Sequence, residues 1–194
     1  MNEISIVATS FVTEADLPSA RLGQRFGRLD SQSQLALLAV AELKINFSEF
    51  PPGRIGIVLD ARVGSLTTDV NFWNGRTGVG GPSPTLFAYT LPSAAIGEIA
   101  ICFKLTGPNL CVIGAGENLL REAADLIERG EADTCICVFC EVISNDLAKI
   151  ISCPTAASAH AIFLKRGEGP AYGPEFNRDM KLFYALISQT KSAS

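Results

Sequence analysis

The chain has 194 residues, of which 47% are hydrophobic and 19% charged, and its formal net charge is −4. This apolar content supplies the core of a single domain and excludes a disordered chain. The acidic balance argues against general binding to nucleic acid or to an anionic membrane surface. The sequence contains no apolar run of the ~18 residues that a membrane span needs and no secretory signal at its start, so we expect a cytoplasmic protein.

Six cysteines are present, and most of them lie in strongly apolar segments. A chain of this length folds without disulfides, so we expect reduced cysteines that pack as small hydrophobic residues. Cys135, Cys137 and Cys140 have a spacing that a metal site could use. However, the sequence has no second cysteine cluster, and His160 is its only histidine. We therefore expect neither a metal site nor a cofactor.

Short apolar stretches alternate with stretches whose apolar residues recur at helical spacing. In chain order, we expect a strand at Ile4–Ala8, a helix from Ser31 to about Leu43, a strand at Arg54–Leu59, a helix at Ser93–Leu105, a strand at Leu110–Ile113, a helix at Glu117–Arg129, strands at Thr134–Val142 and Ala157–Lys165, and a last helix at Phe176–Ile187. The strand at Thr134–Val142 is apolar on both faces, as a central strand would be. This alternation predicts layered α/β architecture with a mostly parallel sheet.

The helix boundaries carry the expected local signals. Asp30 or Ser31 can cap the first helix, and Pro92 suits the first position of the second. Gly107 stops that second helix, and Gly130 is a natural C-terminal cap for the third.

A sharp turn between a strand and a helix is predicted at Val112–Asn118. Such a turn can present a nucleophile at a helix N-terminus, where the dipole stabilises an anion. Here the turn offers Gly114, Ala115 and Gly116, which have no reactive side chain. Two glycines could cradle a phosphate, but the third glycine of a dinucleotide fingerprint is missing, and Glu117 would repel the phosphate. The simplest interpretation of Glu117 is a carboxylate stabilised by the helix dipole.

Several segments carry a family resemblance in a consistent order. They are Ser83–Ala100 followed by Leu105–Asn109, Arg54–Leu59 with Gly64–Asp69, Glu128–Asp133, and Ala159–Arg166. Together they resemble the first half of β-ketoacyl synthases of the thiolase superfamily, over about residues 4–169. The resemblance implies half of a thiolase-like fold, with a mixed, mostly parallel sheet and helices packed on it, in one domain over 1–194.

Two departures from the family pattern bear on activity. The resemblance places Gly116 where the synthases have their nucleophilic cysteine, and a glycine cannot form a thioester. The second half of the fold, which supplies the histidines or the histidine and asparagine of these enzymes, has no counterpart in this sequence. Cys111 lies five residues before the turn position within an apolar strand and is a poor substitute. His160 lies between alanines, as a structural histidine would.

The resemblance therefore implies a non-catalytic, chain-length-factor-like subunit in fatty-acid, polyketide or aryl-polyene biosynthesis. Such subunits pair with a ketosynthase, and a second copy of this chain is an alternative partner. Synthase dimers join near the strand before the nucleophile turn, so the candidate interface residues are Leu110, Cys111, Val112, Ile113 and Gly114. The candidate residues of an acyl tunnel are the aromatic side chains Phe72, Trp73, Phe87 and Tyr89.

Two other functions stay open. The chain could be a module that binds acyl groups or an acyl carrier protein. Because carrier proteins are acidic, docking would need a basic patch, and Arg21, Arg25 and Arg28 are spaced to share one side of a turn or helix. Alternatively, the chain could be an atypical acyltransferase that acts only in complex with a full ketosynthase. Glu117 or Cys111 would then carry the chemistry.

Overall fold

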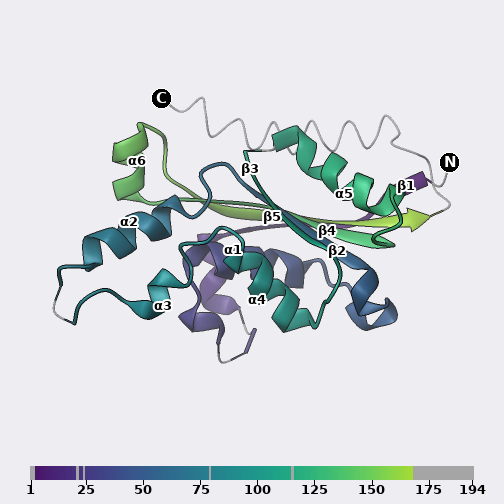
Figure 1. The fold of residues 1–194 in the computed structure, drawn as a ribbon, viewed down its shortest axis with the longest axis horizontal. Helices are drawn as coiled ribbons and strands as arrows, with labels where there is room; N and C mark the ends of the chain where they lie inside the picture. The colour runs from purple at the N-terminus through teal and green to yellow at the C-terminus, as the bar shows by residue number, and fades with distance from the viewer. Residues whose placement is uncertain (1–2, 21, 24, 79, 115, 168–194) are drawn as a thin grey trace.

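A computed structural model describes residues 3–20, 22–23, 25–78, 80–114 and 116–167 (Figure 1). The described strands form one mixed five-stranded sheet with the order β1-β5-β4-β2-β3. The strands are β1 (Glu3–Thr13), β2 (Ile55–Ala61), β3 (Asn109–Ile113), β4 (Thr134–Ile143) and β5 (Ala156–Gly167). Each expected strand is confirmed, and β1 continues five residues beyond the expected end at Ala8.

The parallel part of the sheet is smaller than the sequence predicted. β2 pairs in parallel with β3 and β4, but β5 runs antiparallel to both β4 and β1. The connection from β4 to β5 contains only the short helix α6 (Asn145–Ile151). At about 1.5 Å per residue, seven helical residues cannot return along a ten-residue strand, so the chain reverses direction into β5.

Helices cover both faces of the sheet (Figure 1). α1 (Ser31–Glu42) and α4 (Ala94–Phe103) lie against one face, and α5 (Leu119–Glu128) lies against the other. Each side encloses its own apolar cluster, and successive residues of β4 join them alternately, such as Ile136 in one and Cys137 in the other. Burial on both faces explains why β4 is apolar throughout most of its length.

Three further helices gather at the end of the sheet where β2 and β4 finish (Figure 1). They are α6, α2 (Leu66–Gly75) and α3 (Pro84–Phe87), and the sequence patterns predicted none of them. The short 3₁₀ segments are η1 (Glu14–Ser19), η2 (Phe26–Arg28), η3 (Phe47–Glu49), η4 (Pro52–Arg54) and η5 (Gly116–Asn118). Thr67 attaches α2 to the sheet, because its hydroxyl donates to the Val142 carbonyl oxygen at 2.7 Å.

Two of the predicted helix ends have the expected local chemistry, but those of α4 differ. α4 begins at Ala94 with Ser93 as its N-cap, so Pro92 precedes the helix, and it ends at Phe103, where Lys104 rather than Gly107 takes the left-handed conformation (φ +57°). Asp30 caps α1, and its Oδ1 accepts from the Ser33 N–H at 3.0 Å. The expected third helix begins as η5 and becomes α-helical at Leu119, and Gly130 with φ +73° follows its end. The expected helix at Phe176–Ile187 lies outside the described residues.

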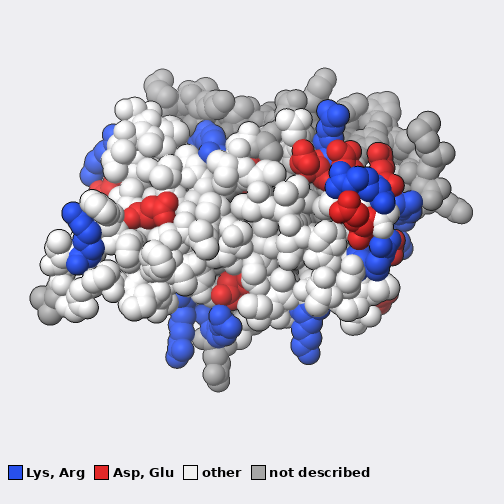
Figure 2. All heavy atoms as spheres, viewed as in Figure 1, with Lys and Arg blue, Asp and Glu red and all other residues white. Residues whose placement is uncertain are grey.

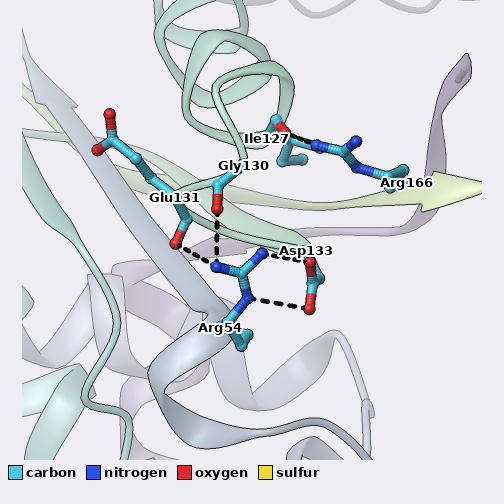
Figure 3. Close-up of polar contacts among 6 residues, drawn as sticks. All are labelled: Arg54, Ile127, Gly130, Glu131, Asp133 and Arg166. Atoms are coloured by element: carbon cyan, nitrogen blue, oxygen red, sulfur yellow. Dashed lines mark hydrogen bonds and ion pairs between the residues drawn. The ribbon is translucent and has the colours of Figure 1, made fainter. Parts of the chain in front are cut away.

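Arg54 ties the start of β2 to the turn between α5 and β4 (Figure 3). Its Nη2 and Nε contact the two carboxylate oxygens of Asp133 at 2.6 and 3.1 Å, and its Nη1 donates to the Gly130 carbonyl at 2.7 Å. The hydrogen bonds from Arg54 lower the pKa of Asp133. Beside this pair, Arg166 of β5 donates to the Ile127 carbonyl oxygen of α5. These contacts are structural and hold the end of the sheet that lies away from α2 and α6.

Three further expectations from the sequence concern the packing of the cysteines, a metal site and membrane-spanning segments. Cys135, Cys137 and Cys140 are free and buried in the core clusters, whereas Cys102 is exposed on α4. Within the described ranges, no three His, Cys, Asp or Glu side chains come together as metal ligands. None of the helices described here has both the length and the apolar character needed to cross a bilayer.

Gly107 allows the loop after α4 to pass directly over β2. A Cβ atom at Gly107 would clash with the Ile55 carbonyl oxygen, whereas a Cβ at Gly97 in α4 meets no atom within 4 Å. We expect Gly107→Ala to reduce the free energy of unfolding by about 1–3 kcal/mol or more, because the backbone must move. The matched variant Gly97→Ala should instead raise it by about 0.5–1 kcal/mol, since alanine favours the helix. Urea unfolding measures both, and equal effects would contradict this account of Gly107.

Candidate functional site

The strand–turn–helix unit predicted from the sequence lies between β3 and α5. Gly114 and Gly116 both have positive φ, +69° and +53°, which a residue with a side chain adopts only with strain. The turn lies beyond the C-terminal ends of the parallel strands β2 and β3. Ligands in α/β folds bind at this edge of the sheet, so the turn is the first place to look for chemistry.

Two hydrogen bonds attach this turn to the end of β2. The Gly114 N–H donates to the Ala61 carbonyl oxygen at 3.3 Å, and the Gly116 N–H donates to Asp60 Oδ2 at 2.8 Å. Asp60 is fully buried. The Gly116 N–H, which could otherwise help to bind an anion at the start of a helix, therefore already has a carboxylate as its acceptor.

A second buried carboxylate lies on the neighbouring strand β4. The Glu141 side chain is 5% exposed, and its Oε2 pairs with Arg62 Nε at 3.3 Å. Burial raises the pKa of Glu141, and the charge of Arg62 acts in the opposite direction. The sequence patterns indicated neither Asp60 nor Glu141 as a site residue. The signal available was an acidic residue next to the end of each apolar strand.

Cys111, one of the two sequence candidates for the chemistry, and His160, which was expected to be structural, both lie in surroundings that are unfavourable for catalysis. Cys111 is half-buried on β3, where burial and the charge of Asp60 raise the pKa of its thiol. A raised pKa leaves little reactive thiolate at neutral pH. His160 packs on Phe11 with ring centroids 4.3 Å apart, and burial lowers its pKa to about 4. This packing agrees with the structural role expected for His160.

The proposed interface residues lie on and directly after β3, one of the two edge strands of the sheet. β3 pairs with β2 on one side, and no described strand pairs with its other side. Leu110 and Val112 pack against the α5-side cluster, whereas Ile113 is 55% exposed.

Exposed apolar side chains continue around this edge. Ile113 Cδ1 and Pro92 Cγ both lie within 3.3 Å of the position that a Cβ atom at Gly64 would take. Leu91 and Leu66, which neighbour these residues in the chain, are 64% and 41% exposed. We call Leu66, Leu91, Pro92 and Ile113 the β3-edge patch.

The four tunnel candidates divide into separate groups. Phe72 of α2 and Phe87 of α3 come together, with ring centroids 5.4 Å apart. Trp73 is largely exposed and stacks under the Arg76 guanidinium at 3.6 Å. Tyr89 donates from its hydroxyl to Glu98 Oε1 at 3.1 Å, so its polar end belongs to a different contact.

Of the three arginines proposed for carrier docking, the structure describes Arg25 and Arg28. Arg25 Nη2 pairs with Glu98 Oε1 at 3.1 Å, and Arg28 is exposed at the end of η2. Arg21 and the side chain of Glu117 lie outside the described residues.

No family model and no curated protein matches this sequence. Solved structures do match. A chain of the ketosynthase complex with its chain length factor from Xenorhabdus doucetiae is 24% identical with a TM-score of 0.65, and the match covers 86% of this chain and 80% of that chain. The chain has a ketosynthase-type fold.

Two further structures support this assignment of the fold. The ishigamide ketosynthase/chain length factor is 18% identical with a TM-score of 0.68, over 87% of this chain and 63% of that chain. A type II ketosynthase complex with its acyl-carrier protein is 12% identical with a TM-score of 0.66, over 86% and 63% of the two chains. The thiolase-like α/β fold implied by the sequence motifs is thus confirmed, and this chain spans less than two thirds of the length of these two matched chains.

The low pKa of His160 predicts a pH-dependent stability. The unfolded chain takes up a proton near pH 6.5 and the folded chain near pH 4, so protonation favours unfolding between these values. Stability should be full above about pH 6.5 and decrease as the pH falls to about 4. His160→Gln should flatten this part of the profile, as measured by urea unfolding at each pH. An unchanged dependence of stability on pH in this variant would show that other titratable groups cause it.

Proposed function

We propose that this chain is a non-catalytic, chain-length-factor-like subunit that pairs with a ketosynthase in fatty-acid, polyketide or aryl-polyene biosynthesis. The observation that carries the proposal is Gly116. It lies in the turn between β3 and α5, where the resemblance to β-ketoacyl synthases places their cysteine nucleophile. A glycine has no side chain to accept an acyl group, so the family's covalent mechanism is not available at this position.

The surroundings of Gly116 support the same interpretation. Acyl transfer requires N–H donors for the oxyanion of the transition state. The Gly116 N–H instead donates to the buried Asp60 carboxylate, whose negative charge also opposes an oxyanion nearby. The thiol nearest in the chain, Cys111, has a raised pKa. These features disfavour the alternative of an atypical acyltransferase that uses Cys111.

The edge of the sheet supports the pairing. An edge strand with apolar side chains beside it is a surface that proteins usually cover. β3 and the β3-edge patch combine these two features, and two of the matched structures contain a ketosynthase together with a chain length factor. In this proposal, a ketosynthase covers this edge. The Phe72–Phe87 pair is then a candidate for the wall of an acyl tunnel.

A module that binds an acyl carrier protein is the second candidate. It is favoured by the exposed cations Arg25 and Arg28 on a chain whose net charge is negative, and one matched structure contains an acyl-carrier protein with its ketosynthase.

The absence of acyl transfer can be tested by mass. The purified chain is incubated with an acylated carrier protein, and its intact mass is measured, with a complete ketosynthase as the positive control. We expect no added acyl mass on this chain, because Gly116 offers no nucleophile. A stoichiometric acyl adduct would contradict the non-catalytic proposal.

The β3-edge interface can be tested by substitution. Ile113→Lys places a charge in the β3-edge patch and should weaken binding to a co-expressed ketosynthase by about 30-fold, the effect of about 2 kcal/mol at an interface centre. Ile101→Lys, at a residue on α4 that is 61% exposed, is the matched control and should bind normally. Surface plasmon resonance measures both dissociation constants. Equal binding by the two variants would show that β3 is not part of the interface.

A further inference from the structure

Three aromatic rings form a row across neighbouring strands on the α5 side of the sheet. The strand registers place Phe11 of β1 opposite His160 of β5, and His160 opposite Phe139 of β4. Phe139 belongs to the α5-side cluster, and the Phe11 and His160 rings lie with their centroids 4.3 Å apart. Phe139 and His160 are buried, whereas Phe11 is 56% exposed. This aromatic row is therefore exposed where it reaches β1.

α5 lies over the other strands of this face. It packs mainly on β4 and β2, and its end is tied to the end of β5, where Arg166 donates to the Ile127 carbonyl oxygen. β1 lies beyond β5 at the edge of the sheet and carries two exposed apolar side chains, Val7 and Phe11. The stretch Ile4–Thr13 of this strand contains no charged residue. An uncharged edge strand with exposed apolar side chains is a surface that proteins usually cover.

The sequence after β5 contains a segment that needs such a surface. In the helix expected at Phe176–Ile187, the residues Phe176, Met180, Phe183 and Ile187 recur at i, i+4, i+7 and i+11 and would form one apolar stripe. A helix of about 12 residues is marginal in water by itself, because tertiary packing of its apolar side supplies most of its stability. The expected helix therefore requires an apolar surface to pack on.

The chain leaves the sheet within reach of the aromatic row. β5 ends at Gly167, seven residues after His160, which corresponds to about 23 Å along a strand. The eight residues 168–175 can span up to about 26 Å when extended. The expected helix adds about 18 Å to this reach. A helix at Phe176–Ile187 can therefore lie level with Phe11 and His160.

The end of the sheet from which the chain leaves is rich in charge. Figure 2 shows Lys, Arg, Asp and Glu side chains gathered at the end of the molecule where Figure 1 places the end of β5. The ion pairs Arg54–Asp133 and Arg129–Glu131 belong to this region, and the Arg166 N–H of β5 donates to the Asp133 carbonyl oxygen. Charged groups offer no matching surface to an apolar stripe. The aromatic row and the exposed side chains of β1 do offer one.

We propose that residues 176–187 form a helix that packs beside α5 on the β1–β5 side of the sheet, with its apolar stripe on Phe11 and His160. The contact uses neither β3 nor the β3-edge patch, so the proposal goes beyond pairing with a ketosynthase and does not depend on it. Burial of the Phe11 ring and of the apolar stripe supplies the energy. The aromatic row then belongs to the interior of the chain and is not a surface for a partner.

Hydrogen exchange of the full chain, followed by mass spectrometry, tests for the packed helix. The amides of residues 176–187 should exchange at least about tenfold more slowly than in a free peptide of the same sequence, because packing protects the helix. Phe183→Asp should remove this protection. Lys181→Asp introduces the same residue away from the apolar stripe and should keep the protection. Exchange at the free-peptide rate in the unchanged chain, or equal loss of protection in both variants, overturns the proposal.

Substitutions in the sheet locate the contact. Phe11→Ser should reduce the protection of residues 176–187 severalfold, because it removes the exposed ring from the aromatic row. The matched control is Leu91→Ser in the β3-edge patch, where the leucine is 64% exposed, and it should leave the protection unchanged. Equal effects of the two variants would contradict packing of the segment on β1.

NMR spectroscopy provides a second readout at the aromatic row. His160 is the only histidine of the chain, so its imidazole signals are identified without further assignment. Phe183→Leu keeps an apolar side chain but removes the aromatic ring, and it should shift these signals. Phe87→Leu, at an exposed phenylalanine of α3, is the control and should not shift them. Unshifted His160 signals in Phe183→Leu would place the segment on another surface and overturn the proposal.

Two further measurements separate this proposal from its alternatives. Ile113→Lys should leave the protection of residues 176–187 unchanged even if it loses the ketosynthase, so the two proposals can fail independently. Light scattering reports whether the segment packs on a second copy of the chain. A dimer that Phe183→Asp dissociates would assign the contact to two copies and overturn packing within one chain. Protection that requires a bound ketosynthase would overturn it as well.

Discussion

Asp60 brings a carboxylate into the fully buried end of β2, and the Gly116 N–H hydrogen-bonds to it across the turn that begins α5. A buried carboxylate is costly unless hydrogen bonds compensate for the lost water, so this contact constrains the turn strongly. Gly114 adds a second bond to the same strand end. Together these contacts fix β3 beside β2 and direct α5 back over the sheet. The position of the β3 edge therefore depends on Asp60, a polar group in the interior.

In the proposed function, a ketosynthase-type fold is kept without the family's covalent chemistry, and the contact between Gly116 and Asp60 is consistent with this proposal. A turn of this kind in an enzyme offers a side chain as nucleophile and N–H groups to an oxyanion. Here Gly116 has no side chain, and its backbone N–H already donates a hydrogen bond to the Asp60 carboxylate. In this proposal the turn serves as a structural joint, and the function of the chain depends on the surfaces that the turn positions.

Local sequence signals predicted the structural features that depend on residues close together in the chain. The cap at Asp30, the apolar stripe of α5 and the mostly apolar β4 are all in the structure, because helix capping and two-sided burial leave short-range patterns. Asp60 and Glu141 were missed, since a lone acidic residue in an apolar strand does not reveal which distant group pairs with it. For Glu141 that group is Arg62. Tyr89 was grouped with Phe87 on residue type, but its hydroxyl meets Glu98.

The sequence by itself determined the alternation of strands and helices, the order of the ketosynthase-like segments and the glycine at the turn. These are properties of residue type and spacing. Only the tertiary structure decided the direction of β5, the partner of the Gly116 N–H and the pairing of Arg25 with Glu98. Each of these depends on segments far apart in the chain, which long-range packing brings together and which no local period records.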